Sequence, residues 1–106
     1  MKAALQPFYS NGRREVASRP GKPGYTVHEL KTHPQHYRAV DARIKTFEVR
    51  WNGDRDFKIG DRLWLREWDP ADNSYTGESL VALVTHILPS HDGLTEGFVC
   101  MAIVVL

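Results

Sequence analysis

The feature that most constrains the fold is the stretch of residues 45–51, in which polar and apolar residues alternate strictly from Thr46 to Trp51. A period of two is typical of a half-buried strand, which has one apolar face and one polar face. Glu48 and Arg50 share the polar face, where a carboxylate beside a guanidinium can form a simple ion pair or hold a planar ligand. The stretch therefore predicts a strand whose outward face is polar and whose inward face carries Phe47, Val49 and Trp51.

Other stretches also have strand character, and turn signals such as Asn52-Gly53 and Gly60-Asp61 separate some of them. The last two of these stretches, residues 79–88 and 97–105, are apolar on both faces, as expected of strands near the centre of a sheet. Short strands joined by tight turns predict a mainly β (α+β) fold, a small antiparallel β-barrel with one short helix on its side. The expected strands cover residues 25–31, 45–51, 62–68, 79–88 and 97–105.

A single helix is predicted over residues 35–42. Pro34 fits its first turn, and Thr32 or His33 fits its cap. The helix is short, so packing must stabilise it. The residues expected to face inward are Tyr37, Val40 and Ile44.

The length of 106 residues predicts one domain. Residues 1–24 are rich in turn formers and are expected to be a flexible leader, with the domain over residues 25–106. No apolar run approaches the roughly 20 residues of a membrane helix. The apolar run formed by the first five residues is too short for a signal peptide. The single cysteine, Cys100, excludes an intramolecular disulfide and favours a cytoplasmic setting.

Charge is distributed unevenly along the chain, although the net charge is only +1. Beyond Arg66 there is no lysine or arginine, while six acidic residues remain. The fold could gather the positive charge of the first two thirds on one face, as a nucleic-acid binder does. Alternatively, the acidic residues between 54 and 61 could cancel it, and the sequence leaves both arrangements open.

The sequence lacks the spacings of several common reactive sites. No two histidines have zinc-finger or His-Glu-x-x-His spacing, so we expect no metal. A serine-nucleophile motif and a glycine-rich phosphate loop are also missing, and no cofactor is expected. The histidines are His28, His33, His36, His86 and His91.

Six short motifs, taken in order, resemble the ASCH domains of the PUA-like superfamily. The resemblance covers residues 25–106 and is strongest to a small bacterial and phage branch of unknown function. It implies a PUA-like barrel that binds RNA or a nucleotide-like ligand in a cleft between barrel and helix. The motifs are His28-Glu29-Leu30-Lys31, Lys45-x-x-Glu48-x-Arg50, Arg55-Asp56-Phe57, Gly60-Asp61, Leu65-Arg66-Glu67-Trp68-Asp69 and Tyr75-Thr76-Gly77.

The candidate ligand-contacting residues are charged or aromatic. Lys45 and Arg50 would bind phosphate, while Glu48 would accept a hydrogen bond from a base. Aromatic side chains next to basic ones suit stacking on bases, and of Trp64 and Trp68 we expect Trp68 to be the exposed one. The full set is Lys31, Lys45, Glu48, Arg50, Arg55, Arg66, Trp68 and Tyr75.

Two other classes of function remain open. The first is a metal-independent enzyme with Lys45 and Glu48 as catalytic residues, either a ribonuclease or an amidohydrolase acting on modified nucleosides. ASCH amidohydrolases resemble this chain at the lysine but have threonine three residues later, where Glu48 stands here. The second is a protein-interaction module. The sequence leaves the oligomeric state and the identity of the ligand open.

Overall fold

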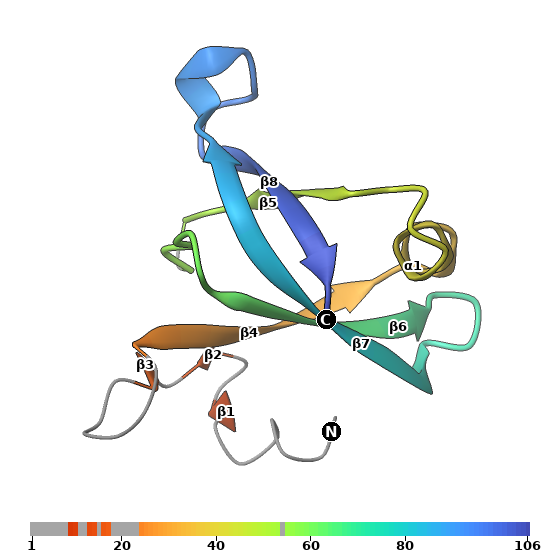
Figure 1. Ribbon diagram of the computed structural model, residues 1–106. Coiled ribbons are helices and arrows are strands. Elements are labelled where there is room, and N and C mark those ends of the chain that lie inside the picture. Colours follow the sequence, from red (N-terminus) through yellow and green to blue (C-terminus); the bar gives the residue numbers. More distant parts are fainter. Residues whose placement is uncertain (1–8, 11–12, 15, 18–23, 54) are drawn as a thin grey trace.

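The computed structural model describes residues 9–10, 13–14, 16–17, 24–53 and 55–106. These residues form a mainly β protein with one short α-helix, as the sequence predicts (Figure 1). Within them, no helix has the length and apolar character needed to cross a membrane. In chain order the elements are β1 (Tyr9–Ser10), β2 (Arg13–Arg14), β3 (Val16–Ala17), β4 (Tyr25–Thr32), α1 (Pro34–Asp41), β5 (Phe47–Trp51), β6 (Arg62–Asp69), β7 (Ser74–Leu88), the 3-10 turn η2 (Ser90–Asp92) and β8 (Phe98–Val105).

The expected leader, residues 1–24, falls mostly outside the described residues and stays a prediction. Apart from Gly24, its described parts are three strands of two residues each. β1 and β2 pair with each other, and β3 pairs with the start of β4, where Val16 lies beside Thr26.

One sheet contains β3 and the five longer strands, in the order β3-β4-β6-β7-β8-β5. The prediction of an antiparallel sheet is wrong for one pair, because β4 and β6 run parallel, from Val27 beside Arg62 to Thr32 beside Glu67. The chain passes through α1 and β5 between these two strands, and such a crossover allows parallel pairing. All other neighbours in the sheet are antiparallel.

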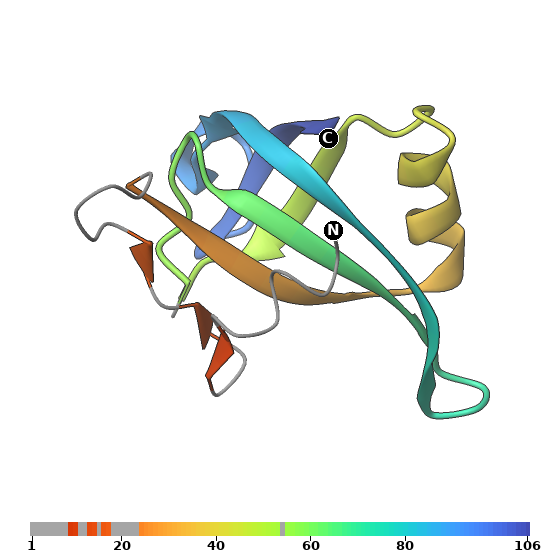
Figure 2. The same cartoon turned by 60° about the horizontal axis from the view of Figure 1, so that its bottom comes forward.

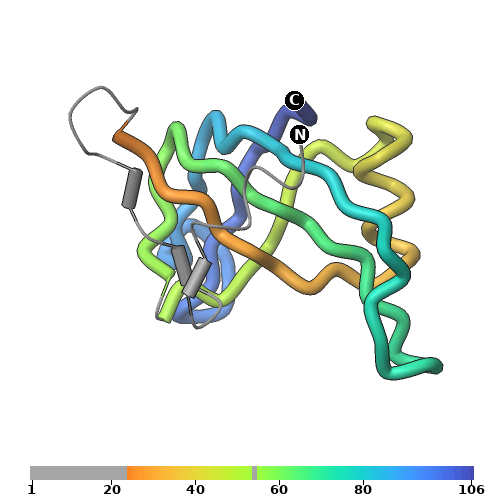
Figure 3. The backbone as a smooth tube through the Cα atoms, turned by 90° about the horizontal axis from the view of Figure 1, so that it is seen from below, coloured from red at the N-terminus to blue at the C-terminus, as the bar shows by residue number. Residues whose placement is uncertain are grey.

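The sheet curls so that β4 and β5 approach each other, although they lie at opposite ends of the five longer strands (Figure 3). Within the described residues no backbone ladder joins them, so the sheet is not closed. A side chain bridges the opening instead. Arg50 on β5 donates to the backbone oxygen of Lys31 at 2.9 Å and to the hydroxyl of Thr32 at 3.1 Å, both on β4.

The apolar core fills the inside of this curl, and α1 stands at one end of it (Figure 2). β8 lies between β7 and β5, which confirms its expected place away from the edge of the sheet. Burial of apolar surface is the main force that holds such a fold together. The buried members of the core are Leu30, Tyr37, Val40, Phe57, Leu63, Leu65, Leu80, Ala82, Val84, Val99, Met101 and Ile103.

Most of what was predicted for the helix is confirmed. His33 is the N-cap and Pro34 occupies the first turn, while Tyr37 and Val40 are buried. Ile44 was expected to face inward, which is wrong, since 81% of it is exposed. The helix ends at Asp41, and a positive φ of 62° at Arg43 redirects the chain before Ile44.

The faces of β5 are the reverse of those predicted. Glu48 is only 2% exposed, whereas Val49 is 45% and Trp51 is 56% exposed. The register gives the reason, because Glu48 lies beside the fully buried Met101 and Val49 lies beside Cys100 on the outer face. The polar side of this strand therefore faces the interior, where its charges must be neutralised.

A buried aspartate joins β4 to the turn before β6. The carboxylate of Asp61 lies 2.8 Å from Nε2 of His28 and accepts hydrogen bonds from the backbone N–H groups of Thr26 and Lys58, at 3.1 and 3.0 Å. Burial raises the pKa of Asp61, but these hydrogen bonds outweigh that effect and hold the pKa below its usual value. Asp61 is therefore a structural anchor.

Candidate functional site

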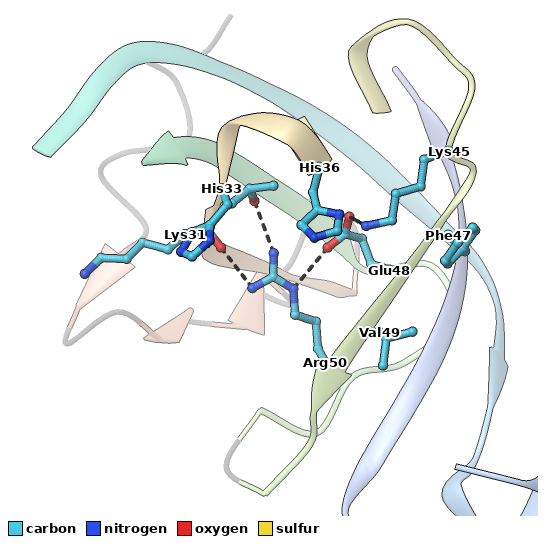
Figure 4. Close-up of a pocket in the computed structure, with 9 residues that line it drawn as sticks. Lys31, His33, His36, Lys45, Phe47, Glu48, Val49 and Arg50 are labelled. Carbon is cyan, nitrogen blue, oxygen red and sulfur yellow. Dashed lines mark hydrogen bonds and ion pairs between the residues drawn. The ribbon is translucent and has the colours of Figure 1, made fainter. Parts of the chain in front are cut away.

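The main candidate site is a pocket at the opening between β4 and β5, next to the start of α1. It has a volume of about 520 Å³ (Figure 4). Its position follows from the curl of the sheet, since the two strand edges approach without pairing. The lining residues are Lys31, Thr32, His33, His36, Lys45, Phe47, Glu48, Val49 and Arg50.

Glu48 lies at the bottom of this pocket and is held from two sides. Its Oε2 accepts a hydrogen bond from Nζ of Lys45 at 3.1 Å, and its Oε1 accepts one from Nε of Arg50 at 3.0 Å. The side chains of Lys45 and Arg50 are 16% and 24% exposed. The structure thus confirms that these three residues are partners and corrects the expected exposure of Glu48.

The two cations keep hydrogen-bonding capacity beyond these contacts. Arg50 makes its contacts with described residues through one N–H of each guanidinium nitrogen. A guanidinium has five N–H groups and an ammonium has three. Toward described residues, two N–H groups on Arg50 and two on Lys45 are therefore unused. Together with Glu48, the cluster carries a net charge of +1.

His33 and His36 complete the pocket on the side of α1, and sequence reasoning did not include them in the site. Their spacing gave no signal for metal binding, and His33 was otherwise expected only as a possible helix cap. Both residues line the pocket, and Figure 4 shows the His36 imidazole beside Glu48 and Arg50 and the His33 imidazole beside Lys31. The signal that could have found them is their pair of positions at the helix start, the N-cap and the third helical residue.

The structure places four of the expected residues in a second cluster, on the outer face of the sheet. Nζ of Lys31 lies 3.9 Å from the ring centroid of Trp68, whose ring meets that of Tyr75 edge-on at 4.9 Å. The guanidinium of Arg66 lies 3.8 Å from the Tyr75 ring centroid and pairs with Glu29. We call Lys31, Arg66, Trp68 and Tyr75 the outer aromatic cluster.

Lys31 belongs to both places, because its backbone oxygen binds Arg50 while its ammonium group points away from the pocket (Figure 4). Arg55, also expected in the site, lies between β5 and β6 and does not line this pocket. Trp68 is partly exposed and Trp64 is 4% exposed, which confirms Trp68 as the more accessible of the two.

A second pocket, of about 620 Å³, lies between α1, the first half of β7 and the C-terminal residues. Its charges balance, since Asp41 and Glu78 accompany Arg43 and Arg62. Burial, followed by nearby carboxylates, raises the pKa of Tyr37 to about 12, so this phenol stays neutral. The second pocket therefore lacks the surplus positive charge of the first.

No group of three or more His, Cys, Asp or Glu side chains in the described part of the chain is arranged to hold a metal ion.

In a comparison with known protein families, the model of a domain of unknown function, DUF3850, matches residues 27–103. The matched segment contains every lining residue of the main pocket and all members of the outer aromatic cluster. The comparison with curated proteins gives no match.

Proposed function

We propose that this protein, which belongs to the DUF3850 family, binds single-stranded RNA or a nucleotide-like ligand in the pocket between β4, α1 and β5. We infer a PUA-like arrangement, supported by the curl that brings β5 to β4. The single cysteine supports a cytoplasmic role.

The observation that carries the proposal is the surplus cation at the bottom of the pocket. Glu48 holds Lys45 and Arg50 in fixed positions, yet both keep N–H groups that form no hydrogen bond with a described residue. Charge-assisted hydrogen bonds to phosphate are among the strongest in proteins, and an arginine can make two to one phosphate group. A phosphate therefore fits the pocket better than a cation or a neutral sugar does.

The pocket also offers a surface for a base. Phe47 lines it and is 45% exposed, and Nζ of Lys45 lies 5.3 Å from its ring centroid. Base stacking on an aromatic ring contributes about 1 to 3 kcal/mol. A nucleotide whose phosphate binds Lys45 and Arg50 would thus have an aromatic ring within reach, which supports a nucleotide-like ligand over inorganic phosphate.

We expect binding of single-stranded RNA to weaken with salt at a slope of about −1.4 in log affinity against log salt, because two phosphate-binding cations line the pocket. Arg50→Gln should lower the affinity at least about tenfold, since it removes charge-assisted hydrogen bonds of about 1.5 to 3 kcal/mol. Fluorescence anisotropy at several salt concentrations measures both quantities.

Lys58→Gln is the matched control, because Lys58 is exposed, lies outside the pocket and pairs only with Asp56 among the described residues. It removes the same unit of charge and should leave the affinity nearly unchanged. Equal losses for both variants would show that only net charge matters. Undetectable binding to any single-stranded RNA at low salt would refute the proposal and favour the protein-interaction alternative.

From the outer aromatic cluster we predict that a longer oligonucleotide makes contacts that a mononucleotide cannot make. Because Lys31 connects the pocket to Trp68, a strand of several nucleotides bound in the pocket can extend to that ring. Trp68→Ala should weaken binding of an oligonucleotide about tenfold by loss of stacking and leave binding of a mononucleotide unchanged. Titration of both ligands into both proteins is the measurement, and an equal effect on the two ligands would contradict the extension.

An amidohydrolase is the less suitable alternative at this site. Glu48 occupies the place of the threonine that the resembling enzymes carry, and both of its oxygens are engaged by cations. A carboxylate held in this way is a weak nucleophile. The pocket therefore supports binding of a phosphorylated ligand more directly than attack on an acyl group.

A further inference from the structure

The start of α1 breaks the usual rules for helix ends at two positions that face the same side. The N-cap normally carries Ser, Thr, Asp or Asn, and the third helical residue is often Glu or Gln, because these side chains satisfy free N–H groups at the helix start. Here the two positions carry His33 and His36, and His33 forms no capping hydrogen bond with its side chain. Positions that forgo a local stabilising choice are those where functional residues are expected.

Both imidazoles are exposed and line the main pocket. Neither has a hydrogen bond, ion pair or ring contact with any other described residue. The charged groups that share the pocket with them are Lys45, Glu48 and Arg50 from β5 and the segment before it, and the backbone of Lys31 from β4. Two imidazoles and a fixed pair of cations thus line the same pocket.

We propose that His33 and His36 are a general acid and base pair that cleaves single-stranded RNA bound in this pocket, an inference that rests on the proposed function. Histidine is the side chain best suited to exchanging protons near neutral pH. Cleavage of RNA through its own 2′-hydroxyl needs one group to remove a proton, another to supply one, and cations beside the phosphate. The pocket contains each of these groups.

In the reaction, one imidazole in its neutral form takes the proton of the 2′-hydroxyl, and the 2′-oxygen attacks the adjacent phosphorus. Lys45 and Arg50 stabilise the negative charge that builds up on the phosphoryl oxygens. The bond from phosphorus to the 5′-oxygen breaks, and the other imidazole, in its protonated form, gives its proton to that oxygen. The products are a 2′,3′-cyclic phosphate and a 5′-hydroxyl, and the two imidazoles have exchanged protonation states.

The test uses the full chain and a single-stranded DNA oligonucleotide with one central ribonucleotide, prepared with each of the four bases, in the presence of EDTA. We expect a single cut after the ribonucleotide, with a cyclic phosphate on the upstream product, identified by mass spectrometry. The matching 2′-O-methyl oligonucleotide should bind and stay intact, because it lacks the attacking hydroxyl.

His33→Gln and His36→Gln should each lower the cleavage rate about 100-fold or more, while binding of the 2′-O-methyl oligonucleotide changes by less than about threefold. His91→Gln is the control, since His91 is exposed in η2, away from the pocket, and should leave the rate unchanged. Both pocket histidines are exposed, so these variants should keep the melting temperature of the parent.

The outcomes separate the two proposals. Binding of the oligonucleotides without any cut refutes the acid and base roles and leaves the proposed function standing. Cleavage that survives both histidine substitutions also refutes those roles. Absence of binding refutes the proposed function, and this inference with it.

Discussion

Asp61→Ala is expected to destabilise the protein by about 3 to 5 kcal/mol, because it removes the acceptor of several buried hydrogen bonds at once and each group left unsatisfied costs about 1 to 3 kcal/mol. Its carboxylate accepts hydrogen bonds from the N–H groups of Thr26 and Lys58 and lies 2.8 Å from Nε2 of His28. Alanine would leave these groups buried without an acceptor. Small domains have a total stability of about 5 to 15 kcal/mol, so this change removes a large part of it. Urea denaturation measures the effect.

Asp72→Ala is a suitable control because Asp72 is exposed in the turn between β6 and β7. It should change the free energy of unfolding by less than about 0.5 kcal/mol, as surface substitutions usually do. A loss below about 1 kcal/mol for Asp61→Ala would show that water replaces the carboxylate, contrary to the anchoring role.

Asp61 also makes the stability of the protein depend on pH in the acidic range. The pKa of Asp61 is lower in the folded state than its ordinary value of 3.8, so the unfolded chain binds its proton more readily. Its contribution to stability is therefore fully present above the ordinary pKa and is lost as the pH falls through the lower pKa of the folded state. In Asp61→Asn this part of the acid dependence should be absent from denaturation curves recorded as the pH falls below 4.

Glu48→Gln is the second change with a large expected effect, a loss of about 2 to 3 kcal/mol of stability together with a loss of ligand binding. The side chain keeps its shape, but an amide presents an N–H group to Lys45 or Arg50, where a carboxylate presents an acceptor to each. Two cations that are only 16% and 24% exposed would then lose their shared counter-charge. Thermal unfolding and RNA binding should be measured on the same preparation.

Glu96→Gln is the control, since Glu96 is exposed in the loop before β8 and lies outside the pocket. A double-mutant cycle with Lys45→Met then isolates the interaction, because the second substitution removes one of the two cations that Glu48 neutralises. We expect the double variant to be less destabilised than the sum of the single ones. Strict additivity would mean that Lys45 and Glu48 do not interact energetically.

The local sequence pattern was sufficient to predict those parts of the fold that depend on residues close together in the chain. The strands at 25–32, 62–69 and 98–105 and the helix that begins at Pro34 are at or close to their expected positions. The partnership of Lys45, Glu48 and Arg50 was also predictable, because residues two or three apart along a bent segment are within reach of one another. A short span of sequence contains all the information that these features need.

Tertiary structure alone decided which face of β5 is buried. Alternation shows that a strand has two faces, and it favours the apolar one for the interior. Here Glu48 lies beside Met101 from β8, and cations at both sides make its burial tolerable. The partner strand lies about fifty residues away along the chain, which is beyond the range of any local pattern.

The composition of the site was decided in the same way. The curl of the sheet and the crossover from β4 to β6 bring His33 and His36 into one pocket with Arg50. They also separate Arg66, Trp68 and Tyr75 from the pocket, although their charge and aromatic character made them equally good candidates in the sequence. The sequence by itself determined where strands, turns and the helix form and which residues carry charge. Only the tertiary structure determined which of these residues share a pocket, because that depends on strand direction and on which edges of the sheet meet.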